Sequence, residues 1–343
     1  MSLARLLLLT LALLLSSCGK QPFYQEQAYV FGTQVDVSIY GEDEAKARQA
    51  TVAVMHEFQR LHDMLHAWKP SELSSLNAAI ARGKTLQVSP ELAVMLKDAA
   101  QVSKQSGGLF NPAIGGLIQT WGFQADDFKA VLPDAEKVAT LVKAKPQMSD
   151  LMITGKQVRS KSRSLKLDLG GYAKGYALDR AVAILKEQGI HNALINIGGN
   201  VMALGTHGAR PWMVGIQHPR KPGPLAVLEL RDGEAIGTSG DYQRYFELDG
   251  KRYCHLIDPR SGYPVQGVQA VTILVRGEHA GLRSDSNSKP LFISGVQGWQ
   301  DAARRMQLEE ALLVDGEGVV HLTAAMQKRL KFTNEATRRE VAP

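Results

Sequence analysis

Hydrophobic and polar positions predict a strand and two helices in the first half of the chain. Residues 35–40 alternate between apolar and polar side chains, as a half-buried strand does. From about Glu42 to Leu65, apolar residues recur at helical spacing, which predicts a long amphipathic helix. The stretch Ser89-Pro90-Glu91 supplies a cap, a first-turn proline and an early acid, so a second helix is expected from here to about Ser106.

The second half is richer in strands and glycine turns. Residues 164–169 and 193–197 each predict a strand that ends at a Gly-Gly pair. Residues 174–188 return to helical spacing and are followed by Gly189, a common helix stop. These patterns predict a strand, a helix and a second strand in succession.

Further strands are expected near the end of the chain. Asp249-Gly250 lies between residues 245–248 and 252–256 and is a strong hairpin signal. Residues 271–275 and 311–314 predict two more strands. Because the helices come in long blocks rather than alternating evenly with strands, we expect an α+β fold with mixed or antiparallel sheets flanked by helices. The pattern is less typical of a doubly wound parallel sheet.

The first residues have the features of an export signal. Arg5 precedes an apolar run, Leu6 to Leu15, which is too short to span a bilayer as a helix. The run ends in Leu15-Ser16-Ser17-Cys18, the pattern of a lipobox, in which the thiol of Cys18 is lipidated. The alternative is a chance cysteine after an ordinary signal peptide. Lipidation would make the mature chain begin at Cys18.

This leader sets the expected organisation and location. We expect a bacterial membrane lipoprotein that faces the periplasm and contacts the membrane through its lipid. The inner membrane is the expected site, although Gly19 after the cysteine leaves the outer membrane open. The expected segments are a signal peptide (1–17), a lipid anchor and tether (18–29), one catalytic domain (30–333) and a polar tail (334–343).

Composition narrows the class of protein. Cys18 and Cys254 are the two cysteines, so a lipidated Cys18 would leave Cys254 without a disulfide partner. The net charge is +6, but basic and acidic residues are interspersed, and no block of one sign suggests a nucleic-acid-binding arm. A modest positive balance suits an anionic ligand such as a dinucleotide, or an anionic membrane surface.

The segment from Asp168 to Gly175 is the strongest candidate for ligand binding. A predicted strand delivers Asp168 to a Gly-Gly turn, and the turn opens into a helix whose free N–H groups can hold a phosphate. Lys174 adds an ammonium in the first turn. A plain strand-to-helix turn that uses glycine for its geometry is the alternative. The dinucleotide-binding spacing G-x-G-x-x-G is missing, and Gly83-Lys84-Thr85 has Ala78 where a P-loop needs glycine.

Together with other motifs, this segment resembles the FAD:protein FMN transferase (ApbE) family. The resemblance extends over nearly the whole mature chain, because seven short stretches occur in the order that the family has. They are Phe31-Gly32-Thr33, Ser71 to Asn77, Ser106 to Pro112, Asp168 to Arg180, Asn196 to Gly199, Thr238 to Tyr242 and His255 to Gly262.

The resemblance implies a set of flavin-binding positions. Taken by itself, an aromatic ring at Trp68 is more typical of a hydrophobic core than of a flavin site. The family commonly has aspartate where Asn111 stands. The residues expected at the FAD site are Phe31, Trp68, Leu109, Phe110, Asn111, Asp168, Lys174 and Ile257.

The resemblance also implies a magnesium ion, held by the backbone carbonyl of Gly171, by Asp285 and by a threonine four residues later. That position is Lys289 here, and an ammonium is expected to pair with Asp285 instead of binding a metal. Three interpretations stay open. Ser286 or Ser288 supplies the missing oxygen, the ammonium replaces part of the cation's charge, or transfer is impaired.

The activity implied by the resemblance is transfer of FMN from FAD to a Thr or Ser hydroxyl of a target flavoprotein, with release of AMP. Such a transfer depends on positioning and on charge neutralisation, with magnesium as the expected cation. Asp285 and His255 are the candidate proton acceptors, although an isolated histidine on a strand is more often structural. The competing hypothesis is an FAD-binding lipoprotein in which Lys289 prevents transfer.

Overall fold

The computed structural model describes residues 22–125 and 127–342. The predicted signal peptide and the lipidation site at Cys18 lie outside these residues. In the described ranges, no helix combines the length and the apolar character needed to cross a bilayer.

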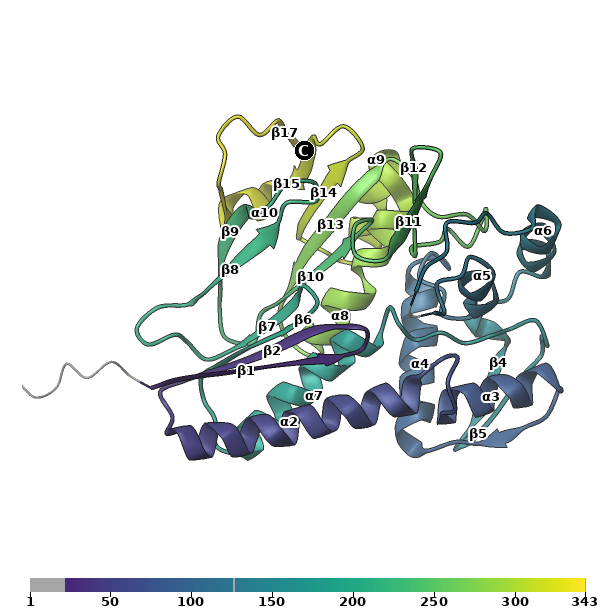
Figure 1. Ribbon diagram of the computed structural model, residues 1–343, viewed down its shortest axis with the longest axis horizontal. Coiled ribbons are helices and arrows are strands. Elements are labelled where there is room, and N and C mark those ends of the chain that lie inside the picture. Colours follow the sequence, from purple (N-terminus) through teal and green to yellow (C-terminus); the bar gives the residue numbers. More distant parts are fainter. Residues whose placement is uncertain (1–21, 126, 343) are drawn as a thin grey trace, which may run out of the picture.

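A nine-stranded sheet forms the centre of the molecule (Figure 1). Its neighbouring strands are antiparallel, except that the last pair is parallel. In sheet order the strands are β1 (Phe23–Val30), β2 (Thr33–Tyr40), β6 (Ala193–Ile197), β7 (Asn200–Leu204), β10 (Ala235–Gly240), β13 (Val268–Val275), β14 (Glu310–Asp315), β15 (Val320–Thr323) and β17 (Arg339–Ala342).

Smaller sheets and helices surround this sheet. The smaller sheets are β3 (Leu86–Gln87) with β5 (Gln157–Ser160) and β4 (Leu151–Thr154), β16 (Leu330–Phe332) with β9 (Pro224–Leu230) and β8 (Trp212–Gln217), and β11 (Tyr245–Leu248) with β12 (Lys251–Cys254). The helices are α2 (Glu44–Leu65), α3 (Glu72–Ala81), α4 (Pro90–Gln105), α5 (Gly115–Thr120), α6 (Ala135–Ala144), α7 (Ala173–Glu187), α8 (Ala280–Ser286), α9 (Ser288–Arg305), α10 (Ala324–Arg329) and the short 3-10 helix η1 (Met148–Asp150).

The central sheet is covered on both faces. Helices α2, α7, α8 and α9 pack on one face, and the β16-β9-β8 sheet with α10 packs on the other (Figure 1). Strand β13 illustrates the consequence: Val271 and Ile273 enter the first core, while Ala270 and Leu274 enter the second. The strand is therefore buried along its whole length, and the fold is the expected α+β class with largely antiparallel sheets.

Several predicted elements are confirmed with their local chemistry. Helix α4 begins with Pro90 in its first turn, and the Ser89 side chain accepts the N–H of Leu92. In the β11–β12 hairpin, Asp249 and Gly250 both have positive φ, 51° and 72°. A two-residue turn that follows the twist of its strands requires this conformation.

The expected tether and tail are wrong in their local structure. Most of the stretch expected to be a tether is strand β1, which pairs with β2 over its full length. Part of the expected polar tail is β17, which pairs with β15. Both are edge strands, and edge strands carry exposed polar side chains that a sequence pattern cannot separate from a loop.

The predicted strand at residues 164–169 is also wrong. Its alternation is real, since Leu165, Leu167 and Leu169 are buried. However, its backbone forms only a single bridge with the loop at 112–115, so no strand ladder forms. Its remaining backbone groups at Leu167 are bonded by a side chain. Asn77 of α3 accepts from the N–H of Leu167 and donates to its carbonyl, at 2.7 and 2.9 Å.

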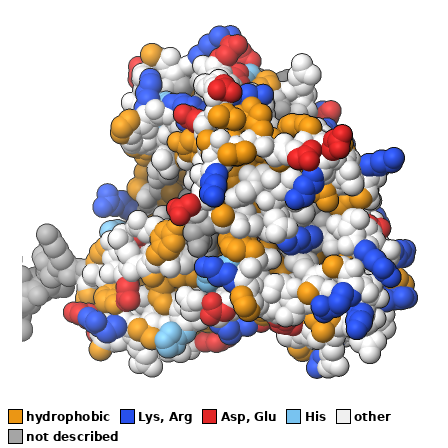
Figure 2. All heavy atoms as spheres, turned by 45° about the vertical axis from the view of Figure 1, so that its right-hand side comes forward, with side chains coloured by type: hydrophobic (Ala, Val, Ile, Leu, Met, Phe, Trp, Pro, Cys, Tyr) orange, Lys and Arg blue, Asp and Glu red, His pale blue; other side chains and the backbone are white. Residues whose placement is uncertain are grey.

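The surface carries charges of both signs. On the face in Figure 2, Lys and Arg side chains are interspersed with Asp, Glu and hydrophobic side chains. Cys254 is buried, and burial raises the pKa of its thiol to about 12, so this cysteine is inert at neutral pH.

We expect Asn77→Ala to lower the free energy of unfolding by about 1–3 kcal/mol, because two buried backbone groups of Leu167 lose their partners. Urea denaturation measures the change. Ser75→Ala, at an exposed position of the same helix, is the control and should change it by less than about 0.5 kcal/mol. Equal effects of the two substitutions would contradict the role given to Asn77.

Candidate active site

The candidate site is built where the start of α7 crosses α8. The crossing is close because Gly175 and Gly281 face each other: a Cβ atom at Gly175 would lie 2.5 Å from the carbonyl oxygen of Gly281. Asp179 of α7 accepts the N–H groups of Gly281 and Leu282, each at 2.8 Å. The carboxylate of Asp179 thereby caps α8 and joins the two helices.

This crossing buries Asp285 completely. One carboxylate oxygen accepts the N–H of Gly175 at 3.0 Å, and the other forms an ion pair with the ammonium of Lys289. The same ammonium donates to the main-chain carbonyl of Asp285 at 2.7 Å. The ion pair predicted from the four-residue spacing is confirmed, although α8 ends between the two residues.

The glycine turn lies against Lys289. A Cβ atom at Gly171 would lie 3.2 Å from Cε of Lys289 and 3.7 Å from the ring of Phe110. The turn, Phe110 and the Asp285–Lys289 pair are therefore neighbours. The N–H groups of Gly171 and Lys174 have no acceptor among the residues that the structure describes.

Lys174 and His255 belong to the same electrostatic group. Burial lowers the pKa of Lys174, an effect that Asp285 opposes and Lys289 reinforces. Within the described chain, the Lys174 ammonium makes no hydrogen bond or ion pair with another side chain. Burial, followed by the charges of Arg244 and Lys174, lowers the pKa of His255 to about 3.

His255 is held as a neutral imidazole with one free nitrogen. Its Nδ1 lies 3.2 Å from the carbonyl oxygen of Arg244. Because a carbonyl can only accept, Nδ1 carries the proton and Nε2 keeps its lone pair. Asp285 behaves differently: burial alone would raise the pKa of its carboxyl group, but Lys289 and Lys174 hold it below its ordinary value.

Asp168 stabilises the turn that it precedes. Its two carboxylate oxygens accept from the N–H of Gly170 at 2.9 Å and from the side-chain amide of Gln124 at 2.8 Å. The side chain is half-buried, so it lies between the loop at 124 and the glycine turn.

Phe31 and Trp68 lie at the two ends of a ladder of rings. Phe31 contacts His62 with ring centroids 5.9 Å apart, His62 contacts His66 at 5.1 Å, and His66 contacts Trp68 at 4.4 Å. Trp68 is 36% exposed, which is unusual for a core tryptophan. An exposed ring of this kind suits stacking on a planar ligand.

The remaining predicted flavin positions are tied to the protein interior. Leu109 and Phe110 are buried. The Asn111 amide donates to the carbonyl of Pro146 at 2.9 Å and accepts from the N–H of Ala113, so an aspartate here could not reproduce the first bond. Ile257 is buried in a small apolar cluster.

The residues expected to hold magnesium do not fit that ion. The Lys289 ammonium lies on the carboxylate where the cation would bind. In residues 22–125 and 127–342, no further His, Cys, Asp or Glu side chains gather with Asp285 into a group of three that could hold a metal ion. The hydroxyl groups of Ser286 and Ser288 are buried and bonded to helix carbonyls, so they do not replace the missing ligand.

Two contributors were missed by sequence reasoning. Arg244 lies 11 residues before His255 and orients it through its carbonyl, and Gln124 lies 44 residues before Asp168. Neither belongs to a recognisable spacing, so the sequence carries no local signal for them. Ser239 was part of a matched stretch, but its buried bond to Ser288 at 2.7 Å was not foreseen.

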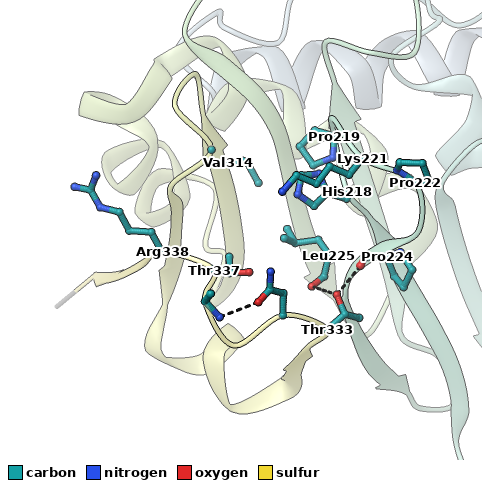
Figure 3. Close-up of a pocket in the computed structure, with 13 residues that line it drawn as sticks. His218, Pro219, Lys221, Pro222, Pro224, Leu225, Val314, Thr333, Thr337 and Arg338 are labelled. Atoms are coloured by element: carbon teal, nitrogen blue, oxygen red, sulfur yellow. Dashed lines mark hydrogen bonds between the residues drawn. The ribbon is translucent and has the colours of Figure 1, made fainter.

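A separate surface pocket lies elsewhere. Figure 3 shows it between the β8–β9 loop and residues 333–338. Its volume is about 330 Å³. His218, Lys221 and Arg338 line it, and none of the predicted site residues does. None of the residues that line this pocket belongs to α7 or α8.

Comparison with known proteins decides the family. A family model described as the ApbE family matches residues 31–313. The chain belongs to the ApbE family. A relative named FAD:protein FMN transferase from Rhodobacter capsulatus is 42% identical over 310 residues, 90% of this chain and 59% of that protein. This chain therefore spans about three fifths of the Rhodobacter protein.

Other family members match over most of their length. A FAD:protein FMN transferase of Klebsiella pneumoniae is 32% identical over 316 residues, 90% of this chain and 94% of the relative. The ApbE crystal structure from Thermotoga maritima has a TM-score of 0.81 and 27% identity, and the match covers 92% of this chain and 100% of the Thermotoga chain. The apo structure of the flavinyl transferase ApbE of Pseudomonas stutzeri has a TM-score of 0.77 and 26% identity, and the match covers 91% of this chain and 98% of the Pseudomonas chain. As the names of the Rhodobacter, Klebsiella and Pseudomonas proteins indicate for this family, the chain is a transferase.

The neutral His255 gives a testable pH dependence. Its pKa is about 3 when folded and about 6.5 when unfolded, so between these values the unfolded chain binds a proton that the folded chain does not. Stability therefore falls as the pH drops through this window. Between about pH 7 and about pH 4.5, we expect His255→Gln to lose about 1–2 kcal/mol less stability than the wild type, after allowance for partial exposure.

Urea denaturation at the two pH values measures this difference. His56→Gln, at an exposed position of α2, is the control and should follow the wild type. Parallel curves for wild type and His255→Gln would show that residue 255 is not held neutral by burial.

Proposed function

We propose that this chain transfers FMN from FAD to a Thr or Ser hydroxyl of a target flavoprotein and releases AMP. The observation that carries the proposal is the convergence of Lys174 and Lys289 on one buried carboxylate beside the glycine turn. Two relatives, from Rhodobacter capsulatus and Klebsiella pneumoniae, are named FAD:protein FMN transferase, which supports the same reaction.

The charges and donors of the site suit a diphosphate. Lys174 and Lys289 bring two positive charges, of which Asp285 compensates one. The Lys174 ammonium and the N–H groups of Gly171 and Lys174 lack protein partners in the described chain. Unpaired main-chain N–H groups at a helix start, next to ammonium groups, are the usual environment of a bound phosphate.

The reaction needs positioning and one proton acceptor. The acceptor hydroxyl oxygen forms a bond to the phosphorus on the FMN side, the anhydride bond to AMP breaks, and AMP leaves with the bridging oxygen. His255 Nε2 is the better acceptor for the hydroxyl proton, because both carboxylate oxygens of Asp285 are already engaged. A bound diphosphate would offset the cations that lower the pKa of His255 and make it a stronger base.

The rival function is FAD binding without transfer. Lys289 is the feature that favours it, because it occupies the position expected to bind a cation. The intact arrangement of Asp168, Lys174, His255 and Asp285 favours transfer, since a binding module needs no oriented base. The two functions differ in whether a covalent product forms.

We expect wild-type protein, FAD and an acceptor flavoprotein with a Ser/Thr flavinylation motif to give a flavin-fluorescent band on a denaturing gel, with one AMP per label. His255→Gln should lower kcat by about 10²–10⁴-fold while leaving KM for FAD within about threefold, because a proton acceptor acts in the transition state. His56→Gln is the exposed control.

Bound FAD without a labelled band, over a wide range of enzyme and acceptor concentrations, would support the binding module instead. A His255→Gln variant with full kcat would remove this residue from the proton transfer.

We also propose that Cys18 carries a lipid that anchors the chain to a bacterial membrane on the periplasmic side, with the inner membrane as the expected location. The lipobox supports this proposal. In a bacterial host, Cys18→Ala should move the protein from the membrane fraction to the soluble periplasmic fraction, measured by immunoblot after separation of the two membranes. Unchanged fractionation would contradict it.

A further inference from the structure

We propose that the Lys289 ammonium takes the place of a divalent cation beside the flavin diphosphate, so that this chain binds FAD and transfers FMN without magnesium. The transfer part rests on the function proposed above, whereas the binding part does not.

Both oxygens of the carboxylate that would hold a cation are already engaged. One oxygen of Asp285 accepts the N–H of Gly175, and the other is paired with Lys289. The main-chain oxygen of Asp285 is bonded to the same ammonium. Magnesium requires near-octahedral oxygen ligands at about 2.1 Å, so it could bind here only if the ammonium left.

Nearby hydroxyl groups do not offer a substitute site. Ser286 donates to the carbonyl of Leu282 at 2.9 Å, and Ser288 donates to the carbonyl of Asp285 at 2.8 Å. Ser288 also bonds to Ser239 of β10. Both serines are fully buried, so turning either hydroxyl toward a metal would leave buried polar groups unpaired.

The charge balance favours an anionic ligand over a second cation. Lys174 and Lys289 against Asp285 leave one net positive charge, and Arg244 adds to the positive potential on Lys174 and His255. A divalent cation in the same place would be repelled by both ammonium groups. The negatively charged diphosphate of FAD would be attracted to them.

Lys289 is held in position before any ligand arrives. Its side chain is 11% exposed, and its stem packs on Gly171, where an added Cβ would lie 3.2 Å from Cε. Two of its three N–H donors are used by Asp285, and the third has no partner among the described residues. A fixed ammonium with one spare donor next to a phosphate-binding turn can contact a phosphate oxygen directly.

FAD binding tests the proposal without relying on transfer. Protein stripped of metal with EDTA is titrated with FAD, with and without added magnesium, and flavin fluorescence gives the Kd. For the wild type we expect the two values to agree within about threefold. In EDTA, Lys289→Thr should bind FAD at least about tenfold more weakly, because one charged contact is lost, and magnesium should restore its affinity.

Two further variants make this result specific. Lys289→Met keeps an unbranched side chain that is one atom shorter, and it provides neither charge nor oxygen, so magnesium should not rescue its affinity. Lys328→Thr, at an exposed position of α10, should behave as the wild type. If the Lys289 variants do not fold, judged by near-UV circular dichroism, the wild-type comparison in EDTA and magnesium decides alone.

The transfer assay separates failure of this proposal from failure of the proposed function. A labelled acceptor in EDTA supports both. Wild-type FAD binding or labelling that requires magnesium overturns this proposal and leaves the function intact. Metal-independent FAD binding without labelling in either condition overturns the function, and the proposal then holds for binding. Absence of FAD binding in both conditions overturns both.

Discussion

The buried carboxylate of Asp285 is the constraint on which the site depends. An uncompensated charge in this position would cost several kcal/mol, so the fold must supply partners from both sides. Gly175 provides an N–H from α7, and Lys289 provides an ammonium from α9. The first bond requires α7 and α8 to approach until no side chain fits at Gly175 or Gly281. The need to compensate the charge of Asp285 thus explains why glycine is needed at both positions.

A similarly close contact joins α8 to the central sheet. A Cβ atom at Gly237 of β10 would lie 2.1 Å from the carbonyl oxygen of Ser284, so α8 rests directly on the strand backbone. Ser239 of that strand then bonds to Ser288 at the start of α9. The two helices that carry Asp285 and Lys289 are therefore held by a strand that is itself buried along its whole length. This support makes the ion pair a rigid part of the fold.

Sequence patterns predicted the parts of the molecule whose signals are local. Helix α4 and the β11–β12 hairpin follow from caps and turn residues, and the Asp285–Lys289 pair follows from a spacing of four. The edge strands β1 and β17 were missed because their exposed faces are as polar as loops. Arg244 and Gln124 were missed because their roles arise from contacts with loops that only the fold brings together. Periodicity reports which face is buried, but it does not report which main-chain carbonyl will orient a histidine.

A fixed ammonium and an exchangeable metal ion place different demands on the surrounding chain. If Lys289 takes the place of a metal ion, it brings one charge instead of two, and Lys174 and Arg244 are the neighbouring cations that would supply the rest. Burial, followed by the charges of those cations, holds the pKa of His255 near 3, which makes it a poor base. A diphosphate that neutralises them would raise the basicity of His255 in the same event. Substrate binding and activation of the proton acceptor are then one electrostatic step, since both depend on the same cluster of positive charges.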